Sequence, residues 1–417
     1  MKNRLFPALC ILASCLVSCS KVEPDPRHED KVDILLTKSE TEYVRSGNML
    51  GARMLDRLQE RHGGSFLISP LSTQIALGLM AAGADGETQE EMVSFLGFGD
   101  DAQSTIQYLS SLSGQLKLAD RKSDLQLSNL IMLNKDFGSE FRPGYKEYIS
   151  SFPEAELMSF NFRKEHDEAA RKANEWSSRQ TAGMIPKLMT AEELQKNPVA
   201  YVVNALYFKS SWTKPFKKEN TRTEEFTCLD RTSRRTPMMN QRDVFRYYEK
   251  DGIKALHMDY GNGAFCYTAI LPDDMADLPA VCGQLADGLL EEIQDNSNPV
   301  TVEVSIPKYK TEMTVDMKEL CKAMGLTIPF DVDKANFGNM MSSDRRVAVT
   351  AFTQLLSINV DESGSEAAAV SKGELGQPTA GEEEKEEYKV FKADHPFVYA
   401  IYETSSGALL FMGIFGD

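Results

Sequence analysis

The chain has 417 residues, of which 42% are apolar and 26% charged, a composition that supports a large folded core and excludes a disordered protein. Its 46 basic and 62 acidic residues give a net charge of −16, which argues against nucleic acid or an anionic polysaccharide as a partner. The length alone would allow two or three domains. No internal repeat divides the chain, so its organisation has to be inferred from its elements in order.

Residues 1–18 have the pattern of an export signal rather than of a folded element. A basic start at Lys2 and Arg4 precedes the apolar residues 5–17, which are too few to span a bilayer. Leu16-Val-Ser-Cys19 then resembles a bacterial lipobox, in which the cysteine becomes the lipidated first residue. A plain secretory signal with an incidental cysteine is the alternative.

The lipobox pattern occurs twice, since Leu12-Ala-Ser-Cys15 fits it as well. We prefer Cys19 because the polar residues Ser20 and Lys21 follow it. Residues 19–40 are rich in charged residues and proline, and they predict an exposed tether. The expectation is a lipoprotein anchored by palmitate to the outer membrane of a bacterium, on its periplasmic or its extracellular face.

Seven cysteines occur in the chain, three of them in the signal region. The other four are scattered singly, without the spacing of a metal site: Cys228, Cys266, Cys282 and Cys321. In an exported chain they could form two disulfides. Single cysteines in a large apolar core are more often small buried hydrophobic residues, and we favour that interpretation.

Helices and strands are predicted from the apolar spacing along the chain. Residues 42–61 place apolar side chains at helical intervals and predict the first long helix. A second helix should begin near Ser69, because a serine followed by proline is a good helix start. Residues 165–180 predict an amphipathic helix. The expected strands are residues 125–133 and 199–208 in a central sheet, and residues 227–263 and 265–271 in antiparallel hairpins.

Residues 360–371 carry the most specific pattern in the chain, Val-Asp-Glu-Ser-Gly-Ser-Glu-Ala-Ala-Ala-Val-Ser. From Ser365 to Gln377, every second residue is uncharged and nearly all are small, and all charges fall on the intervening positions that start at Glu366. As a strand, the segment would have one uncharged face and one solvated face. A loop with the pattern of a strand suggests a switch; an Ala/Ser/Glu linker or a short helix is the ordinary alternative.

This segment resembles the reactive-loop hinge of the serpin family. Further blocks resemble that family in the same order along the chain: residues 66–72, 83–88, 204–212, 215–216, 306–310, 394–399 and 407–413. Each block is weak alone, but their order is hard to obtain by chance. The resemblance implies an α+β serpin fold in one domain, residues 41–417. That fold would have a large central mixed β-sheet, about nine helices, smaller β-sheets and an exposed reactive-centre loop at about residues 362–390.

The resemblance also implies which residues act. The hinge would comprise Glu362, Gly364, Ser365, Glu366, Ala367, Ala368 and Ala369. The residues that control opening of the sheet would be Ser69, Ser72, Asn204, Trp212 and Gln354. Gln354 stands where the family usually has a histidine that bonds to the Asn204 position. Glutamine can donate and accept, so this bond is open to it, and a rewired network is the alternative.

The function implied is suicide inhibition of serine endopeptidases, with papain-like cysteine proteases as a second class of target. A protease would attack the loop and form an acyl-enzyme, and the released hinge would then enter the central sheet as an added strand before deacylation. The alternate positions from Ser365 can enter because most of them are small. Gly364 would supply the backbone freedom at the pivot.

The scissile bond is expected within residues 375–381. Counting forward from Gly364 by the family's spacing places the residue before it at Pro378, whereas counting back from Pro396 gives a position near Glu382. The consecutive charges at residues 382–384 could not enter a core, so the inserted part should stop before them. The expected reactive site is Gln377, Pro378, Thr379 and Ala380. Its composition suggests an elastase-like or broad-specificity target, since Lys385, which would suit a trypsin-like enzyme, lies too far along.

No enzyme chemistry is expected from this sequence. The five histidines form no paired-histidine or Cys/His motif, and there is no nucleophile elbow and no phosphate-binding glycine loop. We therefore expect no catalytic residue, no metal and no cofactor. Residues 100–117, which correspond to the glycosaminoglycan-binding helix of some serpins, contain Lys117 as their single basic residue, so no such partner is expected either. The expected state is a monomer.

Two other functions stay open. One is a non-inhibitory serpin-fold binding or storage module whose loop is only a substrate; the small residues of the hinge favour the inhibitor over it. The other is an adhesion or carbohydrate-capture lipoprotein. It would need exposed sites rich in aromatic residues, of which a chain with two tryptophans and no repeats gives no sign.

Overall fold

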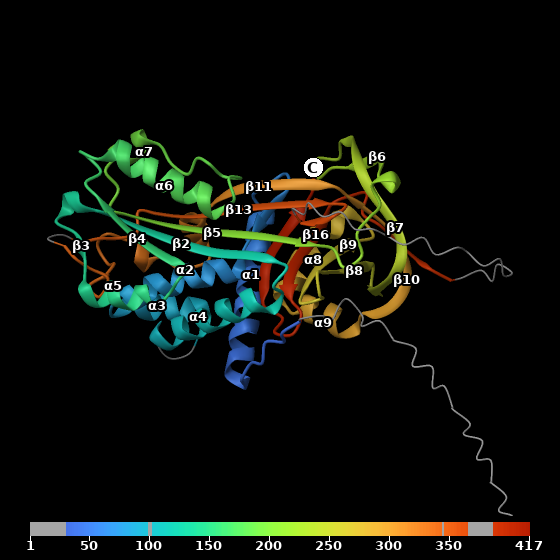
Figure 1. The fold of residues 1–417 in the computed structure, drawn as a ribbon, viewed down its shortest axis with the longest axis horizontal. Coiled ribbons are helices and arrows are strands. Elements are labelled where there is room, and N and C mark those ends of the chain that lie inside the picture. The colour runs from blue at the N-terminus through green and yellow to red at the C-terminus, as the bar shows by residue number, and fades with distance from the viewer. Residues whose placement is uncertain (1–30, 99–101, 344–345, 366–386) are drawn as a thin grey trace, which may run out of the picture.

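A computed structural model describes residues 31–98, 102–343, 346–365 and 387–417, and its centre is a mixed six-stranded sheet. The sheet runs across the molecule (Figure 1). Its strands, in spatial order, are β11 (Tyr309–Asp316), β13 (Ala351–Asp361), β14 (Gly364–Ser365), β5 (Ala200–Ser211), β2 (Asp124–Asn134) and β4 (Ala155–Phe160). The pairs β13–β5 and β2–β4 are parallel and the other pairs are antiparallel. The strands expected at residues 125–133 and 199–208 are thus confirmed as neighbours.

A second sheet of nine strands lies at the right-hand end of the molecule in Figure 1. Its path is β1 (Phe66–Ile68), β17 (Leu409–Phe415), β16 (Phe397–Glu403), β9 (Phe265–Pro272), β8 (Ile253–Tyr260), β7 (Ser233–Lys250), β10 (Asn298–Pro307) and β15 (Lys389–Lys392), and β6 (Arg222–Thr227) pairs with β7. The strands β3 (Glu140–Phe141) and β12 (Met341–Ser342) form a small third sheet. The long β7 continues through both pairings with β8 and β10, which makes this sheet larger than separate hairpins would be.

Ten α-helices occur in the described residues, close to the expected number. They are α1 (Lys38–Gln59), α2 (Pro70–Gly83), α3 (Glu87–Leu96), α4 (Ala102–Ala119), α5 (Pro143–Ser150), α6 (His166–Gln180), α7 (Ala191–Gln195), α8 (Leu278–Ala286), α9 (Leu289–Asn296) and α10 (Met317–Ala323). Helices α1 to α4 lie on one face of the central sheet, and α6 and α7 lie on the other (Figure 1). The amphipathic helix expected at residues 165–180 is confirmed, and its Trp176 is buried against Leu130 and Val203 of the sheet.

Helix α1 begins at Lys38, earlier than the apolar spacing indicated, because of its cap. The Thr37 hydroxyl accepts a hydrogen bond from the Glu40 backbone N–H, and the Glu40 carboxylate accepts one from the Thr37 N–H, which forms a capping box. Ile34 is also buried, and its backbone N–H donates to the Ser405 hydroxyl at 2.8 Å. The last residues of the segment expected to be a tether therefore belong to the folded domain.

All four cysteines of the folded part are buried and free, which confirms the favoured interpretation. Burial raises the pKa of Cys266, Cys282 and Cys321 to about 12, so these thiols stay protonated at neutral pH. None of the helices in the described ranges combines the length and the apolar character that crossing a membrane requires.

Candidate functional site in the central sheet

The seam between β13 and β5 is parted at one end and closed at the other. At its upper end, which we define as residues 360–365 with Ser210–Trp212, the short strand β14 lies between the two: Gly364 is opposite Ser211 and Ser365 opposite Ser210. In its lower part, residues 351–356 of β13 pair directly with residues 201–206 of β5. The hinge therefore begins its course inside the sheet, and the sheet beneath it is closed.

Gly364 is required at the point where the chain turns into the sheet. Its φ of 147° is a backbone conformation that side chains with a Cβ rarely adopt. A Cβ placed there would lie 2.1 Å from the Ser210 carbonyl oxygen, which belongs to the rigid backbone of β5. Only glycine allows β14 to approach β5 this closely, which gives the expected pivot a steric reason.

Ser365 points into the protein, as the alternation of its segment predicts. Its side chain is completely buried, and its hydroxyl shares a 2.6 Å hydrogen bond with the Tyr260 hydroxyl. The Tyr260 ring stacks on Trp212 with centroids 4.2 Å apart and an interplanar angle of 13°. Burial raises the pKa of Tyr260 well above its ordinary value, against the smaller opposite effect of the Ser365 bond, so this partner is a neutral phenol. A small uncharged side chain at position 365 therefore fits the pocket that receives it.

Backbone bonds hold the turn that precedes β14. The Trp212 indole Nε1 donates to the Asp361 carbonyl oxygen at 2.8 Å, and the Trp212 backbone N–H donates to the Ser363 carbonyl oxygen at 2.9 Å. The Phe216 N–H donates to the Glu362 carbonyl oxygen at 2.9 Å. Trp212 thus contacts the turn through its backbone and its ring, and Ser365 through Tyr260.

Glu362 anchors the same turn by charge. Its buried carboxylate accepts hydrogen bonds from the Lys308 ammonium at 2.7 Å and from the Thr221 hydroxyl at 2.8 Å. Burial acts to raise the pKa of Glu362, but the bonds from Lys308 and Thr221 and the pairing with the Lys308 charge outweigh it and hold the pKa below its ordinary value. Glu362 is therefore ionised at neutral pH. No local pattern in the sequence indicates this anchor, since 54 residues separate Lys308 from Glu362.

A cluster of neutral polar side chains spans the lower part of the seam, and we call it the lower clasp. The Gln354 amide donates to the Asn204 side-chain oxygen, the Ser69 carbonyl oxygen and the Thr73 hydroxyl, each at 3.0 Å, and its own oxygen accepts from the Ser69 N–H at 2.9 Å. The Ser72 hydroxyl donates to the Asn204 side-chain oxygen. The bond between Gln354 and Asn204 that the sequence left open is present, although glutamine stands at the position of a histidine.

The lower clasp also includes the start of α2 and a residue of β2. The Asn204 amide donates to the Ser72 carbonyl oxygen and to the Asn129 side-chain oxygen, both at 2.9 Å. Ser69 is the N-cap of α2, and its hydroxyl accepts from the Ser72 N–H. All of these side chains are buried and uncharged. The clasp therefore ties β13 and β5 to the helix beneath them, and the seam cannot widen there without exchanging these hydrogen bonds.

Several expected site residues lie outside the described part of the chain: Glu366, Ala367, Ala368, Ala369, Gln377, Pro378, Thr379, Ala380 and Cys19. Five residues of the site were missed by the sequence reasoning: Thr73, Thr221, Tyr260, Lys308 and Asn129. Lys308 lies within residues 306–310, which were noted for their family resemblance, but an isolated lysine in a strand carries no signal of its distant partner.

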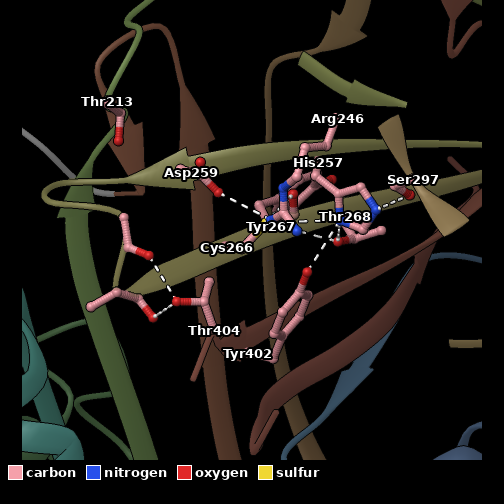
Figure 2. A network of polar contacts seen from close by, with 12 residues as sticks. Thr213, Arg246, His257, Asp259, Cys266, Tyr267, Thr268, Ser297, Tyr402 and Thr404 are labelled. Atoms are coloured by element: carbon pink, nitrogen blue, oxygen red, sulfur yellow. Dashed lines mark hydrogen bonds and ion pairs between the residues drawn. The ribbon is translucent and has the colours of Figure 1, made fainter. Parts of the chain in front are cut away.

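The second sheet contains a buried polar network around His257 (Figure 2). The imidazole lies 2.7 Å from the Thr268 hydroxyl, 3.1 Å from the Tyr402 hydroxyl and 2.8 Å from the Ser297 hydroxyl. Burial, and then the charge of Arg246, lower the pKa of His257 to about 3, so the ring is neutral at physiological pH. Each ring nitrogen has a hydroxyl partner, which is the arrangement of a satisfied structural histidine. Across the described residues, no group of three or more His, Cys, Asp or Glu side chains is placed to hold a metal ion.

The chain is similar to known proteins in both sequence and structure. Residues 45–417 match the family model described as "Serpin (serine protease inhibitor)". An uncharacterised serpin-like protein of Thermococcus kodakarensis is 31% identical over 383 residues, which are 92% of this chain and 87% of that protein. The leukocyte elastase inhibitor of Xenopus laevis is 28% identical over 84% of this chain and 92% of its own length. The native crystal structure of the thermophilic serpin tengpin superposes with a TM-score of 0.81 at 24% identity, covering 93% of this chain and 96% of that one.

Proposed function

The chain belongs to the serpin family, and from this membership we propose that it is a suicide inhibitor of serine endopeptidases. Members of this family generally bind and inhibit proteases. The finer proposal is that a protease is trapped as an acyl-enzyme when the cleaved loop enters the central sheet. One observation carries it: β14 already lies between β13 and β5 at the upper end of the seam.

Two features of β14 and of the segment after it support the proposed insertion step. Ser365 is completely buried. In the sequence after it, every second residue is uncharged and most of these are small, and the charged residues fall on the intervening positions. Serpin loop insertion is itself an established case of strand addition and of the release of stored strain. Each further pair of residues would add ladder hydrogen bonds to β13 and β5. Insertion of about 14 residues, at about 3.3 Å each, would carry the attached protease about 45 Å.

The lower clasp sets what insertion must overcome. An incoming strand has to separate residues 351–356 from residues 201–206 and replace their direct pairing. It also has to displace the Gln354–Asn204 hydrogen bond. The clasp bonds are between amides and hydroxyls, so they can be exchanged for new hydrogen bonds without leaving a charge in the core. Because the lower clasp is uncharged, its hydrogen bonds can hold the sheet closed and can still be exchanged when a strand enters.

The covalent step belongs to the protease. Its serine attacks the scissile carbonyl of the loop, the amine of the following residue leaves, and an ester joins the two proteins. We place this bond within residues 375–381, with Gln377, Pro378, Thr379 and Ala380 as the reactive site. The composition of this window favours an elastase-like or broad-specificity enzyme. The similarity to the leukocyte elastase inhibitor of Xenopus laevis supports the same class of target.

The alternative is a non-inhibitory member of the family whose loop is only cleaved. The two can be told apart with a panel of serine and papain-like cysteine proteases. We expect a covalent complex that survives denaturing electrophoresis with at least one elastase-like enzyme. We also expect cleavage within residues 375–381 to raise the melting temperature by tens of degrees, because the sheet gains a strand. If the loop is cut cleanly once, no complex forms and the melting temperature does not change, the proposal that the protein is an inhibitor is wrong.

We also propose that the protein is anchored by a lipid at Cys19 in the outer membrane of a bacterium. The basic start, the short apolar run and Leu16-Val-Ser-Cys19 support this. Radiolabelled palmitate should enter the wild-type protein and Cys15→Ala but not Cys19→Ala. If the label persists in Cys19→Ala and disappears in Cys15→Ala, the anchor is Cys15. If neither the wild type nor the variants take up label, the signal is a plain secretory one.

A further inference from the structure

We propose that a cavity beside Trp212 binds a small aromatic carboxylate. The cavity is formed by residues 212–214, which follow β5, by residues 244–246 of β7, by residues 257–259 of β8 and by Pro299 of β10. Its volume is about 170 Å³. A dry engineered cavity of about 150 Å³ is known to hold benzene, so this volume corresponds to one aromatic ring with a short substituent. The cavity shares Trp212 with the upper end of the seam, and its other lining residues lie outside the hinge and the lower clasp.

The walls suit a flat apolar group. Trp212, Phe245, Met258 and Pro299 line the cavity. Trp212 is held in place before any ligand arrives, since it stacks on Tyr260 and its indole nitrogen donates to the Asp361 carbonyl oxygen. Ligand sites of this kind combine aromatic and apolar walls with a few polar groups that fix orientation. A preformed wall also lowers the ordering cost of binding.

Arg246 supplies the polar group with unused capacity. Its Nη2 lies 3.4 Å from a carboxylate oxygen of Asp259, near the limit of a hydrogen bond, and 3.5 Å from the Cys266 sulfur, and the guanidinium also interacts with the Tyr402 hydroxyl. Figure 2 shows Arg246 and Asp259 reaching toward Cys266 from neighbouring strands. A guanidinium has five N–H donors in a planar fork. Its side chain is 36% exposed and lines the cavity.

A carboxylate matches that fork better than other anions. It can accept two parallel hydrogen bonds from one guanidinium, which fixes the direction of the attached ring. A phosphate dianion would meet stronger repulsion from Asp259 in the same wall. His257 is neutral and already bonded to three hydroxyls, so it does not compete for the anion.

Lys214, the other cation of the cavity, is already engaged. Its ammonium is paired with the Asp243 carboxylate, donates to the Val244 carbonyl oxygen at 2.9 Å and lies 5.4 Å from the centre of the Phe245 ring. Because Lys214 is already paired, we assign the carboxylate to Arg246. In this assignment the ring of the ligand lies against Trp212 and its carboxylate binds Arg246.

The test uses the intact protein and no protease, so its outcome is independent of the inhibitor proposal. The probe is phenylacetate, and its neutral control is 2-phenylethanol. Titration calorimetry should give one site with a dissociation constant of roughly 0.1–1 mM, as the size of the ligand allows. The alcohol should bind at least tenfold more weakly. Tryptophan fluorescence of Trp176→Phe, which leaves Trp212 as the single indole, should change with the same midpoint.

Three variants separate the proposed contact from a general loss of structure. Arg246→Gln should weaken phenylacetate at least tenfold, and Asp259→Asn should tighten it several-fold because a competing carboxylate is removed. Lys310→Gln, which alters an exposed ion pair with Glu312, should leave it unchanged. Asp259→Asn should leave 2-phenylethanol binding unaffected, which keeps the test valid if Arg246→Gln folds poorly. No binding at 10 mM, equal binding of acid and alcohol, or weaker phenylacetate binding by Asp259→Asn would overturn the proposal.

Discussion

The two ends of the seam between β13 and β5 are held by different chemistry. The upper end contains an inserted strand, an ion pair between Glu362 and Lys308, and an aromatic stack that reaches Ser365 through Tyr260. The lower part has no inserted strand among the described residues, and amides and hydroxyls around Gln354 span it. The upper end is thus fixed in an open state by charge, and the lower part in a closed state by neutral hydrogen bonds.

This difference indicates a direction for opening. The upper end keeps its anchors when more of the hinge enters, because Glu362 and Trp212 hold the turn before β14 and not the strands below it. The lower clasp is the part that must rearrange. Changes at the upper end should therefore alter whether the hinge enters, and changes at the lower clasp should alter how easily the sheet parts.

The largest effect is expected from Ser365→Arg. This change would place an unpaired cation at a completely buried position and cost several kcal/mol, which delays insertion until the protease has been released. The number of inhibitor molecules consumed per protease trapped should rise at least tenfold. Glu366→Arg is the matched control, since the alternation puts it on the other face and its charge should remain in water. If both variants behave alike, the alternation does not govern insertion.

The next largest effect is expected from Gln354→Ala, which acts on the lower part of the seam. It removes four hydrogen bonds and leaves buried groups of Ser69 and Asn204 with fewer partners, so the free energy of unfolding should fall by about 2–4 kcal/mol. Urea unfolding measures this. Gln126→Ala, which removes a glutamine bonded to the exposed Asp124, should cost less than about 0.5 kcal/mol. Equal losses would mean that the clasp does not hold the seam.

Acid should act on the second sheet before it acts on either end of the seam. The pKa of His257 is about 3 in the folded protein, below its ordinary value of about 6.5, so the unfolded chain binds a proton first as the pH falls. The contribution of neutral His257 to the free energy of unfolding is complete above about pH 6.5 and is lost progressively toward pH 3. Between pH 6.5 and 4.5 the loss should be about 2–3 kcal/mol in urea unfolding. His257→Gln should flatten this slope, and an equal slope in the variant would place the effect elsewhere.

The smallest effect is expected from Glu362→Gln, and it should be confined to the upper end. Because Lys308 is 41% exposed, the loss should be about 1 kcal/mol. Hydrogen exchange of the Trp212 and Phe216 amides, which donate to the turn, should become faster, while amides of residues 351–356 should not change.

A pH series provides the control for Glu362→Gln. The folded pKa of Glu362 is lowered, so its contribution is complete above about pH 4.3 and is lost as the pH falls below that value. The wild type should approach the variant's exchange rates in that range. Faster exchange across both parts of the seam would show that the upper anchor and the lower clasp are not independent.

The sequence predicted the parts of the site that depend on local pattern. The burial of Ser365 follows from strand alternation, and the start of α2 follows from a serine before a proline. The Gln354–Asn204 bond could be anticipated because glutamine has both a donor and an acceptor. In each of these cases, the type of one residue and its place in a strand or at a helix start are enough to predict its environment.

The rest depends on contacts that no local pattern encodes. Glu362 meets Lys308 and Thr221 only after three segments have folded together. The cavity beside Trp212 takes its walls from three strands and from residues 212–214, so its volume exists only in the packed protein. The early start of α1 was missed because the helical apolar spacing begins after its capping box.

Strand β15 gives the loop a second attachment with a mechanical consequence. It pairs with β10 over residues 389–392, buries Phe391 and is followed by a bond from the Ala393 N–H to the Ser305 carbonyl oxygen. The segment between Ser365 and Lys389 is therefore tied to two different sheets, one at each end. In the uncut chain β14 and β15 are joined covalently, so the length of chain between Ser365 and Lys389 limits how far the hinge can travel into the sheet. A single cut within this segment separates the two attachments, so the hinge becomes free to move while the hydrogen bonds of β15 stay in place.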